Sequence, residues 1–249
     1  IVDSYADYTF TGKEFGAIVQ YPAANGEVRD YSDFVASAHA VGALVTANAD
    51  LLSLALLASP GEWGADIACG DAQSLGIPMS YGGPYVGFLA CTNANVRKLP
   101  GRIVGATTDV DGKRAFVLTL QAREQHIRRE KANSNICSNQ SLMALYVTIY
   151  LSAMGSKGLE DAGALSYGGA HYLAEKLVAT GKCTMAFNQP FFNEFALRTS
   201  VPAAKVLDAL YAAGILGGVR IADDMLLVCV TEQRTKEEMD RVVEIVNNI

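Results

Sequence analysis

The densest group of residues that could do chemistry lies in residues 123–142, which read REQHIRREKANSNICSNQSL. Its first nine positions hold four cations around one histidine, in a chain whose net charge is −6. A solvated helix face would alternate opposite charges every three or four positions, whereas this segment crowds like charges together. It could form the wall of a pocket for a carboxylate, a phosphate or an acidic partner, or an internal network of ion pairs. The five residues are Arg123, His126, Arg128, Arg129 and Lys131.

The residues that follow the cations are typical of loops and helix caps. Asn133, Ser134 and Asn135 have short polar side chains that bond to nearby backbone groups in turns and at helix N-termini. We therefore expect Asn133 and Asn135 to position the loop that presents the cations. His39 and His171 fall in helical patterns and are expected to be ordinary packing or surface residues.

The composition restricts the class of protein. Half of the 249 residues are hydrophobic and 18% are charged, as in soluble α/β enzymes and unlike disordered chains. A pI near 5.1 without a long basic stripe argues against nucleic-acid binding. No apolar run approaches the roughly 18 residues of a membrane span, and the first residues lack the pattern of an export signal. We expect a cytoplasmic protein without a membrane segment.

The cysteines and other metal-binding residue types predict neither disulfides nor a metal site. The 5 cysteines are widely spaced and include no C-x-x-C pair, so we expect reduced, mostly buried thiols. No cluster of His, Cys, Asp and Glu has the spacing of metal ligands. No nucleophile motif of the G-x-S-x-G type is present.

Short apolar runs alternate with helical patterns through the first two-thirds of the chain. Continuous apolar strands separated by helices are typical of a mostly parallel sheet that is covered on both faces. The expected strands are residues 17–20, 43–47, 65–69, 86–91 and 116–119, with helices at 31–41 and 51–58.

Gly155 marks a break between two parts of the chain. Before it, residues 138–154 should form a long helix capped by Ser138. We place a domain boundary at the break, so that residues 1–154 form one domain and residues 155–249 a second. The apolar face of the long helix is expected at Leu142, Leu145, Tyr146, Ile149 and Ala153.

The second domain should be a small α+β unit with an antiparallel sheet. Its last helix begins with a capping box, in which Thr235 is followed three positions later by Glu238. The expected strands are residues 184–186, 193–197 and 226–230, and the expected helices are residues 159–178 and 203–213.

Two loops in the first domain could approach a ligand. Residues 70–76 follow a strand directly, as phosphate-binding loops do, but their spacing matches neither the P-loop nor the dinucleotide fingerprint. Residues 80–84 form a tight turn in which Gly82 and Gly83 permit positive φ or close approach of a ligand. Plain turns explain both segments at least as well.

These segments together resemble the glycine cleavage system P-protein family, the pyridoxal-phosphate glycine decarboxylases, in its first subunit or N-terminal half. The matching stretches are REQHIRREKANSNICSNQSL, GDAQSLGIPMSYGGPYVGFLA at 70–90, and Pro60-Gly61-Glu62 before Ala65-Asp66-Ile67. The resemblance implies an α/β protein of PLP-dependent transferase fold type I, which is aspartate aminotransferase-like. The chain would supply the C-terminal part of the large domain, with its mostly parallel sheet, and the small C-terminal α+β domain. An earlier segment would supply the rest.

The resemblance also implies that this chain is not catalytic by itself. In the family's catalytic subunit, a lysine in the strand-exit loop forms the Schiff base, and matching the shared G-G-P turn places Gln73 there. An amide cannot form an aldimine, and no lysine occurs between Lys13 and Lys98. The family's Asp that keeps the pyridine nitrogen protonated would match Thr46-Ala47-Asn48, with Asp50 displaced from that role. Pyridoxal 5′-phosphate should therefore be held by the partner subunit.

The implied function is that of the non-catalytic subunit of glycine decarboxylase. The complete enzyme would release CO2 from glycine and transfer the aminomethyl group to the lipoyl arm of the carrier H-protein. This chain would pair with the catalytic P-protein subunit in a heterotetramer and supply a pocket wall or a docking surface. The candidate residues are Ser74, Tyr81, Gly82, Gly83, Arg123, His126, Arg128, Arg129, Lys131, Asn133 and Asn135.

Two alternatives remain open from the sequence. A self-sufficient PLP-dependent lyase or aminotransferase would take its Schiff-base lysine from elsewhere, for example Lys131. A purely structural or regulatory subunit would have lost all part in catalysis.

Overall fold

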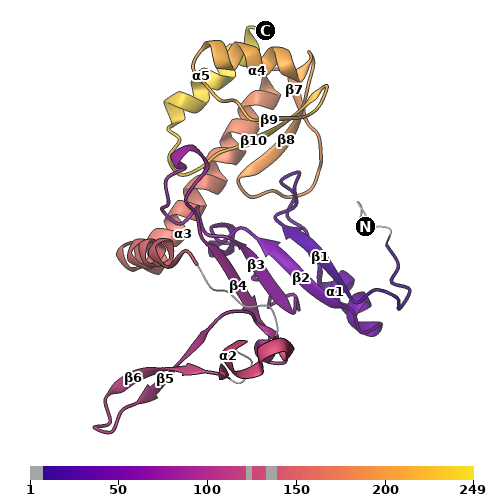
Figure 1. The fold of residues 1–249 in the computed structure, drawn as a ribbon. Helices are drawn as coiled ribbons and strands as arrows, with labels where there is room; N and C mark the ends of the chain where they lie inside the picture. Colours follow the sequence, from indigo (N-terminus) through magenta and orange to yellow (C-terminus); the bar gives the residue numbers. More distant parts are fainter. Residues whose placement is uncertain (1–7, 122–124, 133–138) are drawn as a thin grey trace.

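The computed structural model describes residues 8–121, 125–132 and 139–249. The described strands form a four-stranded sheet in the first part of the chain, a separate two-stranded hairpin, and a four-stranded sheet in the last third (Figure 1). Helix α3 (Ser141–Ala179) runs from the first sheet to the last one.

The first sheet is mostly parallel, as the sequence predicts. Its order is β1-β2-β3-β4, with the first three strands parallel and the fourth antiparallel to β3. The segment between β3 and β4 contains only the 3₁₀ turn η2 (Ser80–Gly82) and no crossover helix, so β4 returns antiparallel. Helix α1 covers one face through Val35 and Ala38. The bounds are β1 (Gly16–Tyr21), α1 (Ser32–Ala40), β2 (Leu44–Ala49), β3 (Ile67–Asp71) and β4 (Gly87–Cys91).

The strand predicted at residues 116–119 was wrongly assigned to this sheet. It is part of β6 (Arg114–Thr119), which pairs with β5 (Ile103–Thr108) in an antiparallel hairpin. The sequence analysis missed β5, because its Gly, Ala and Thr residues dilute the apolar pattern. The Asp109 carboxylate accepts the backbone N–H groups of Asp111 and Lys113 and so closes the turn.

Two predicted helices differ from the structure. Residues 51–58 contain only the 3₁₀ turn η1 (Ser53–Ala55), where the Ser53 hydroxyl donates to the backbone oxygen of Asp50. Such a local side-chain bond competes with regular helix formation. The long helix begins at Ser141, without a side-chain cap, and the predicted cap Ser138 lies outside the described residues.

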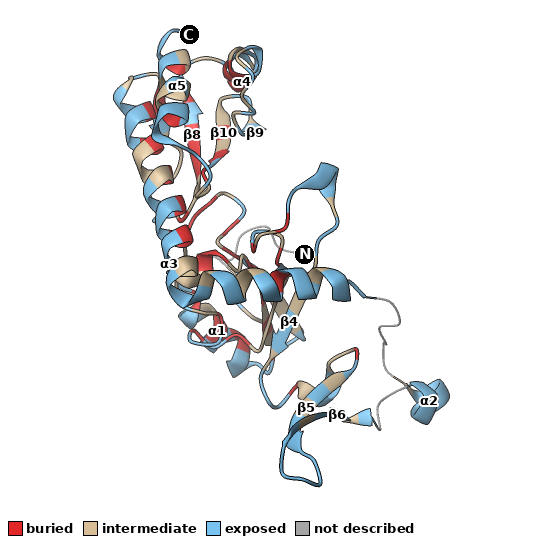
Figure 2. Cartoon of the chain, turned by 90° about the vertical axis from the view of Figure 1, so that its left-hand side faces the viewer, coloured by how far each residue is buried: buried red, intermediate tan, exposed pale blue. Residues whose placement is uncertain are grey.

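Helix α3 changes direction at Gly155, whose φ of 64° and ψ of −179° are not helical. Figures 1 and 2 show two segments that meet there at a steep angle. The predicted apolar face of the first segment is present, but Leu142, Leu145, Tyr146 and Ile149 are exposed (Figure 2). By length and composition alone α3 could span a membrane, a test that core helices of soluble proteins also pass.

The last sheet is antiparallel throughout, as predicted, and has the order β7-β8-β10-β9. The second segment of α3 packs with α4 and α5 on this sheet around Phe195, Leu197 and Leu210. The predicted capping box is confirmed, since Thr235 and Glu238 each accept the other's backbone N–H. The bounds are β7 (Cys183–Met185), β8 (Glu194–Thr199), α4 (Ala203–Ala212), β9 (Val219–Ala222), β10 (Met225–Cys229) and α5 (Lys236–Asn247).

A loop after β1 joins the first sheet to the last one. The backbone N–H of Val28 donates to the oxygen of Pro190 at 2.7 Å, and Glu27 forms an isolated bridge with Phe191. Beside this contact, Phe192 is fully buried with Leu52 and Ala162. The division into domains at residues 154 and 155 stays a prediction.

Gly26 lets the joining loop approach β8 closely, and its substitution should separate the two sheets. Its φ is +88°, and a Cβ atom would lie 2.2 Å from the backbone oxygen of Glu194. We expect Gly26→Ala to lower the free energy of unfolding by about 3 kcal/mol or more. Gly12 is the matched control, because its φ is +84° with open space around it. Gly12→Ala should cost only the left-handed strain, about 1 kcal/mol.

Chemical denaturation of the full-length protein would measure both variants. Equal losses for Gly26→Ala and Gly12→Ala would contradict the importance of the close approach to Glu194.

Candidate functional site

The parallel strands of the first sheet end at one edge, and two exit loops meet there. The Asp50 side chain, just after β2, accepts the backbone N–H of Leu52 and the hydroxyl of Ser74, both at 3.2 Å. The Asp71 side chain, at the end of β3, accepts the backbone N–H of Gln73 at 2.6 Å. The carboxyl edge of such a sheet is the usual place for a ligand in α/β proteins.

Packing against α3 fixes the loop that carries Gln73. Ala72, Leu75 and Ile77 are buried against the first segment of α3. Gly76 has a φ of +85° and faces the Tyr150 ring so closely that a Cβ atom would lie 2.4 Å from it. The loop therefore has a defined position, with Gln73 half-buried and Ser74 exposed.

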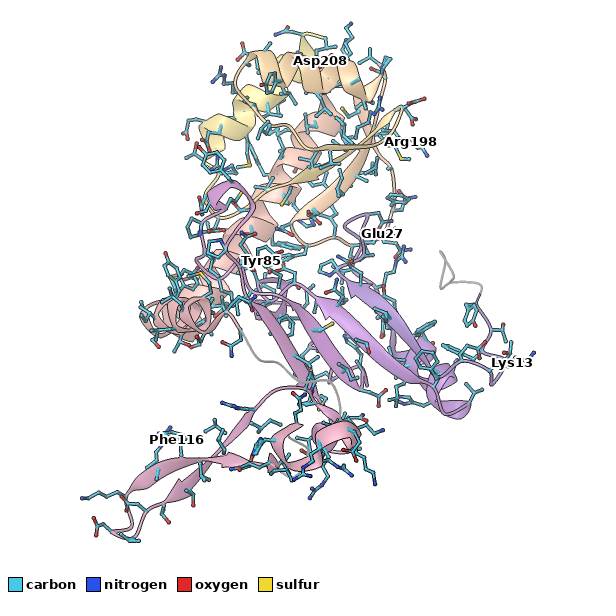
Figure 3. All side chains as sticks on the ribbon, in the orientation of Figure 1. Lys13, Glu27, Tyr85, Phe116, Arg198 and Asp208 are labelled. Atoms are coloured by element: carbon cyan, nitrogen blue, oxygen red, sulfur yellow. The ribbon has the colours of Figure 1, made fainter. Side chains whose placement is uncertain are left out.

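The predicted tight turn is present at the far end of the same loop. Tyr81 has a φ of 57° and Gly82 a φ of 102°, so both lie in the left-handed region. The Tyr81 side chain and Gly82 are exposed, and Gly83 is half-buried. Tyr85, labelled in Figure 3, lies between the turn and β4, which begins at Gly87. Tyr81 and Gly82 therefore lie on the surface of this chain.

Acidic groups from both sheets gather near this edge. Burial raises the pKa of Asp50, and burial followed by the charge of Asp50 raises the pKa of Glu194. Glu194 lies opposite Cys229 in the β8–β10 ladder. Desolvation of the thiol, then the charges of Glu194 and Asp50, raise the pKa of Cys229 to about 12. Sequence reasoning missed this cluster because Asp50 and Glu194 lie far apart along the chain.

The four described cysteines form no disulfide. Cys183 is buried and Cys69 and Cys91 are half-buried. Cys229 is exposed as a residue, although surrounding protein desolvates its thiol. The expectation of mostly buried thiols was therefore wrong for the described cysteines. The described residues contain no group of His, Cys, Asp and Glu side chains that could hold a metal ion.

The described part of the basic segment is short and exposed. His126 and Arg128 lie in α2 (Gln125–Arg128), and Arg129 and Lys131 lie in η5 (Arg129–Lys131). All four are exposed, and none forms an ion pair with a described residue. Arg129 also has a φ of 52°, which is unusual for a residue other than glycine. The described cations therefore do not form an internal ion-pair network. Arg123, Asn133 and Asn135 lie outside the described residues.

Residues 125–132, the described part of the basic segment, and the Gln73 loop lie at opposite ends of the first sheet. In the antiparallel ladder Asp71 pairs with Gly87 and Ile67 with Cys91, so the chain leaves β4 at the end where β3 begins. Figure 1 accordingly shows α2 below the sheet and the β3–β4 loop above it. The structure brings Asp50 and Ser74 together at the carboxyl edge but does not bring residues 125–132 of the basic segment to them.

The chain matches one family over nearly its whole length. The sequence model described as "Glycine cleavage system P-protein" matches residues 1–246. A protein named "Probable glycine dehydrogenase (decarboxylating) subunit 1" from Moorella thermoacetica is 50% identical, over 94% of this chain and 54% of its own length. A protein of the same name from Thermomicrobium roseum is 48% identical, over 91% of this chain and 52% of its own length. The chain thus spans about half the length of these relatives.

Solved structures extend the comparison to the fold. A crystal structure titled glycine decarboxylase (P-protein) of the glycine cleavage system, in inhibitor-bound form, has a TM-score of 0.89 and 42% identity. The match covers 97% of this chain and 56% of the solved chain. An aspartate aminotransferase from Thermus thermophilus matches with a TM-score of 0.61 and 17% identity. The match covers 95% of this chain and 65% of the aminotransferase chain. That likeness shows the fold alone and confirms the expected fold type I.

The buried position of Asp50 predicts a measurable effect of pH on stability. Its folded-state pKa is raised above the ordinary 3.8, so its stabilising contribution is complete below pH 3.8 and is lost as the pH rises through the folded pKa. Asp50→Asn cannot ionise and keeps an acceptor oxygen for Leu52 and Ser74. We expect it to be more stable than the wild type at pH 7, and the difference should vanish as the pH falls toward 3.8.

Denaturant unfolding at several pH values would measure this difference. Asp208→Asn is the control, because Asp208 is exposed on α4 (Figure 3) and should show no such trend. The pKa of Glu194, followed by NMR, should also fall in Asp50→Asn because one neighbouring charge is removed. A loss of stability in Asp50→Asn at pH 7 would contradict the prediction.

Proposed function

The chain belongs to the glycine cleavage system P-protein family, and from this membership we propose that it is part of the non-catalytic subunit of glycine decarboxylase. The complete enzyme would release CO2 from glycine and transfer the aminomethyl group to the lipoyl arm of the H-protein. The observation that carries the proposal is the Gln73 loop, which is rigidly packed at the carboxyl edge but offers an amide where the catalytic subunit needs an amine.

Pyridoxal phosphate does not fit the residues that this chain places at that edge. Its phosphate is an anion, while Asp50, Asp71 and Glu194 concentrate negative charge there and have no ion pair with a described cation. The Asp50 carboxylate is oriented at its Oδ1 by bonds from Leu52 and Ser74 and adds to this negative charge. We therefore assign the cofactor to the catalytic partner subunit.

The basic segment would serve the partner's site rather than this chain's own edge. His126, Arg128, Arg129 and Lys131 are exposed, form no ion pair with described residues, and lie at the opposite end of the sheet from Gln73. Unpaired arginines bind carboxylates and phosphates strongly where water is excluded. The strained backbone of Arg129 also fits a functional position, since such strain concentrates at ligand sites.

The position of Lys131 argues against the self-sufficient PLP enzyme. Lys131 lies in η5 at the far end of the sheet, so it cannot supply an amine to the carboxyl edge of the same chain. The exposed cations argue against a purely structural subunit, because they form no ion pair with a described residue. A cytoplasmic location and the absence of a membrane segment stay predictions.

The first test concerns the cofactor. The full-length subunit alone, incubated with pyridoxal phosphate and borohydride, should give only scattered, substoichiometric labelling of surface lysines. The catalytic subunit, treated in the same way, is the positive control and should be labelled at one lysine. Peptide mass mapping would measure both. Stoichiometric labelling of one lysine in this chain would contradict the assignment of the cofactor to the partner.

The second test concerns the basic segment. Arg129→Ala in the reconstituted complex should lower glycine–bicarbonate exchange about tenfold or more, the value of a lost charge-assisted bond. The melting temperature should hardly change, because Arg129 is exposed without an ion pair to described residues. Arg220→Ala is the control, since Arg220 is also exposed but lies in β9. Unchanged exchange in Arg129→Ala would leave the segment with a structural role only.

A further inference from the structure

We propose that the β5–β6 hairpin, residues 103–119 and here called the arm, docks into an apolar groove rimmed by carboxylates on the catalytic subunit. The inference rests on the proposed function, which supplies that partner. It assigns a binding role to a part of the chain that neither the carboxyl edge nor the basic segment includes.

The arm has one apolar face. Val104 pairs with Leu118, and Ala106 pairs with Phe116, so the four side chains lie on the same side of the ribbon. All four are exposed, and Phe116 is 62% exposed. Arg114 follows on the same face, with its guanidinium carbon 4.9 Å from the centroid of the Phe116 ring. The face thus has an apolar centre and a cation at its margin.

The arm stands clear of both larger sheets. Figures 1 and 2 are turned by 90° from each other, and in both the arm projects from the lower end of the first sheet. Figure 3 places Phe116 far from the other labelled side chains. A two-stranded hairpin alone is at best marginally stable in water, and a contiguous exposed apolar patch is typical of an interaction site. A surface that covers this face would therefore stabilise the arm.

The distribution of charge favours an acidic rim on the partner. Residues 97–131, which contain the arm and the basic segment, include nine lysines and arginines against four acidic residues. The rest of the chain has eleven lysines and arginines against 22 acidic residues. This local excess of positive charge matches carboxylates at the edge of an apolar groove. Arg102 and Lys113, both exposed, lie at the base and at the turn of the arm.

The position of the arm favours the catalytic subunit as the partner that covers its apolar face. The arm ends shortly before α2, and both lie at the same end of the first sheet (Figure 1). The described part of the basic segment begins in α2 and is proposed to face the catalytic subunit. One continuous surface of that subunit would then receive the apolar face of the arm and the neighbouring cations.

The test measures assembly of the full-length subunit with the catalytic subunit. Phe116→Glu should weaken their affinity about 30-fold, as the loss of a central aromatic contact does. Val117→Glu is the matched control, because Val117 is the next residue, is also exposed, and lies on the opposite face of the arm. It should change the affinity less than about threefold. Sedimentation equilibrium or biolayer interferometry would give the dissociation constants, and thermal melting of each subunit alone would be recorded.

Each other outcome overturns the proposal in a distinguishable way. Equal affinities of the wild-type and Phe116→Glu subunits for the catalytic subunit would refute docking of the arm. The proposed function would be unaffected. A lower melting temperature of the Phe116→Glu subunit alone, with unchanged affinity, would show that its own polypeptide covers the face. A loss of self-association instead would identify a second copy as the occupant. If the wild-type subunit does not bind the catalytic subunit, the proposed function is wrong. The docking proposal then fails with it, because it depends on that partner.

Discussion

The contact between the loop after β1 and strand β8 fixes the position of the two larger sheets relative to each other. Gly26 approaches the backbone of Glu194 so closely that no side chain fits, and Glu27 and Val28 bond to the segment before β8. The kink of α3 at Gly155 lets one helix pack on both sheets. Because the sheets are held in this relation, Asp50 from the first sheet lies near Glu194 and Cys229 of the last one, and the acidic cluster exists only as a result.

The charge arrangement divides this chain into an acidic end and a basic end. The carboxyl edge of the first sheet gathers acids, and the exposed cations follow β4 at the other end. A rigid sheet separates the two groups, so the cations cannot neutralise the acids of the same chain. The described cations form no ion pair with a described residue either, and for this reason we interpret them as groups for a partner subunit rather than for a pocket within this chain.

The parts of the fold that local patterns determine were predictable, and the long-range parts were not. Continuous apolar runs predicted β1 to β3, and the Thr235–Glu238 capping box and the break at Gly155 were read from local residue types. Strand β5 and its pairing with β6 were missed because Gly105 and Thr107 hide the alternation of β5. The candidate residues were identified by type, but their division between opposite ends of the sheet depends on the direction of β4, which no local pattern gives.

The amide at position 73 gives the buried Asp50 no counter-charge. The exit loop keeps its position because Ala72 and Leu75 pack on α3, whatever side chain stands at position 73. A cation there would lie beside Asp71 and Ser74, and the Ser74 hydroxyl donates to Asp50. With an amide instead, Asp50 and Glu194 face burial without a counter-charge among the described residues, so the pKa values of these two carboxyl groups rise. The packing that holds the loop in place therefore also maintains an acidic carboxyl edge.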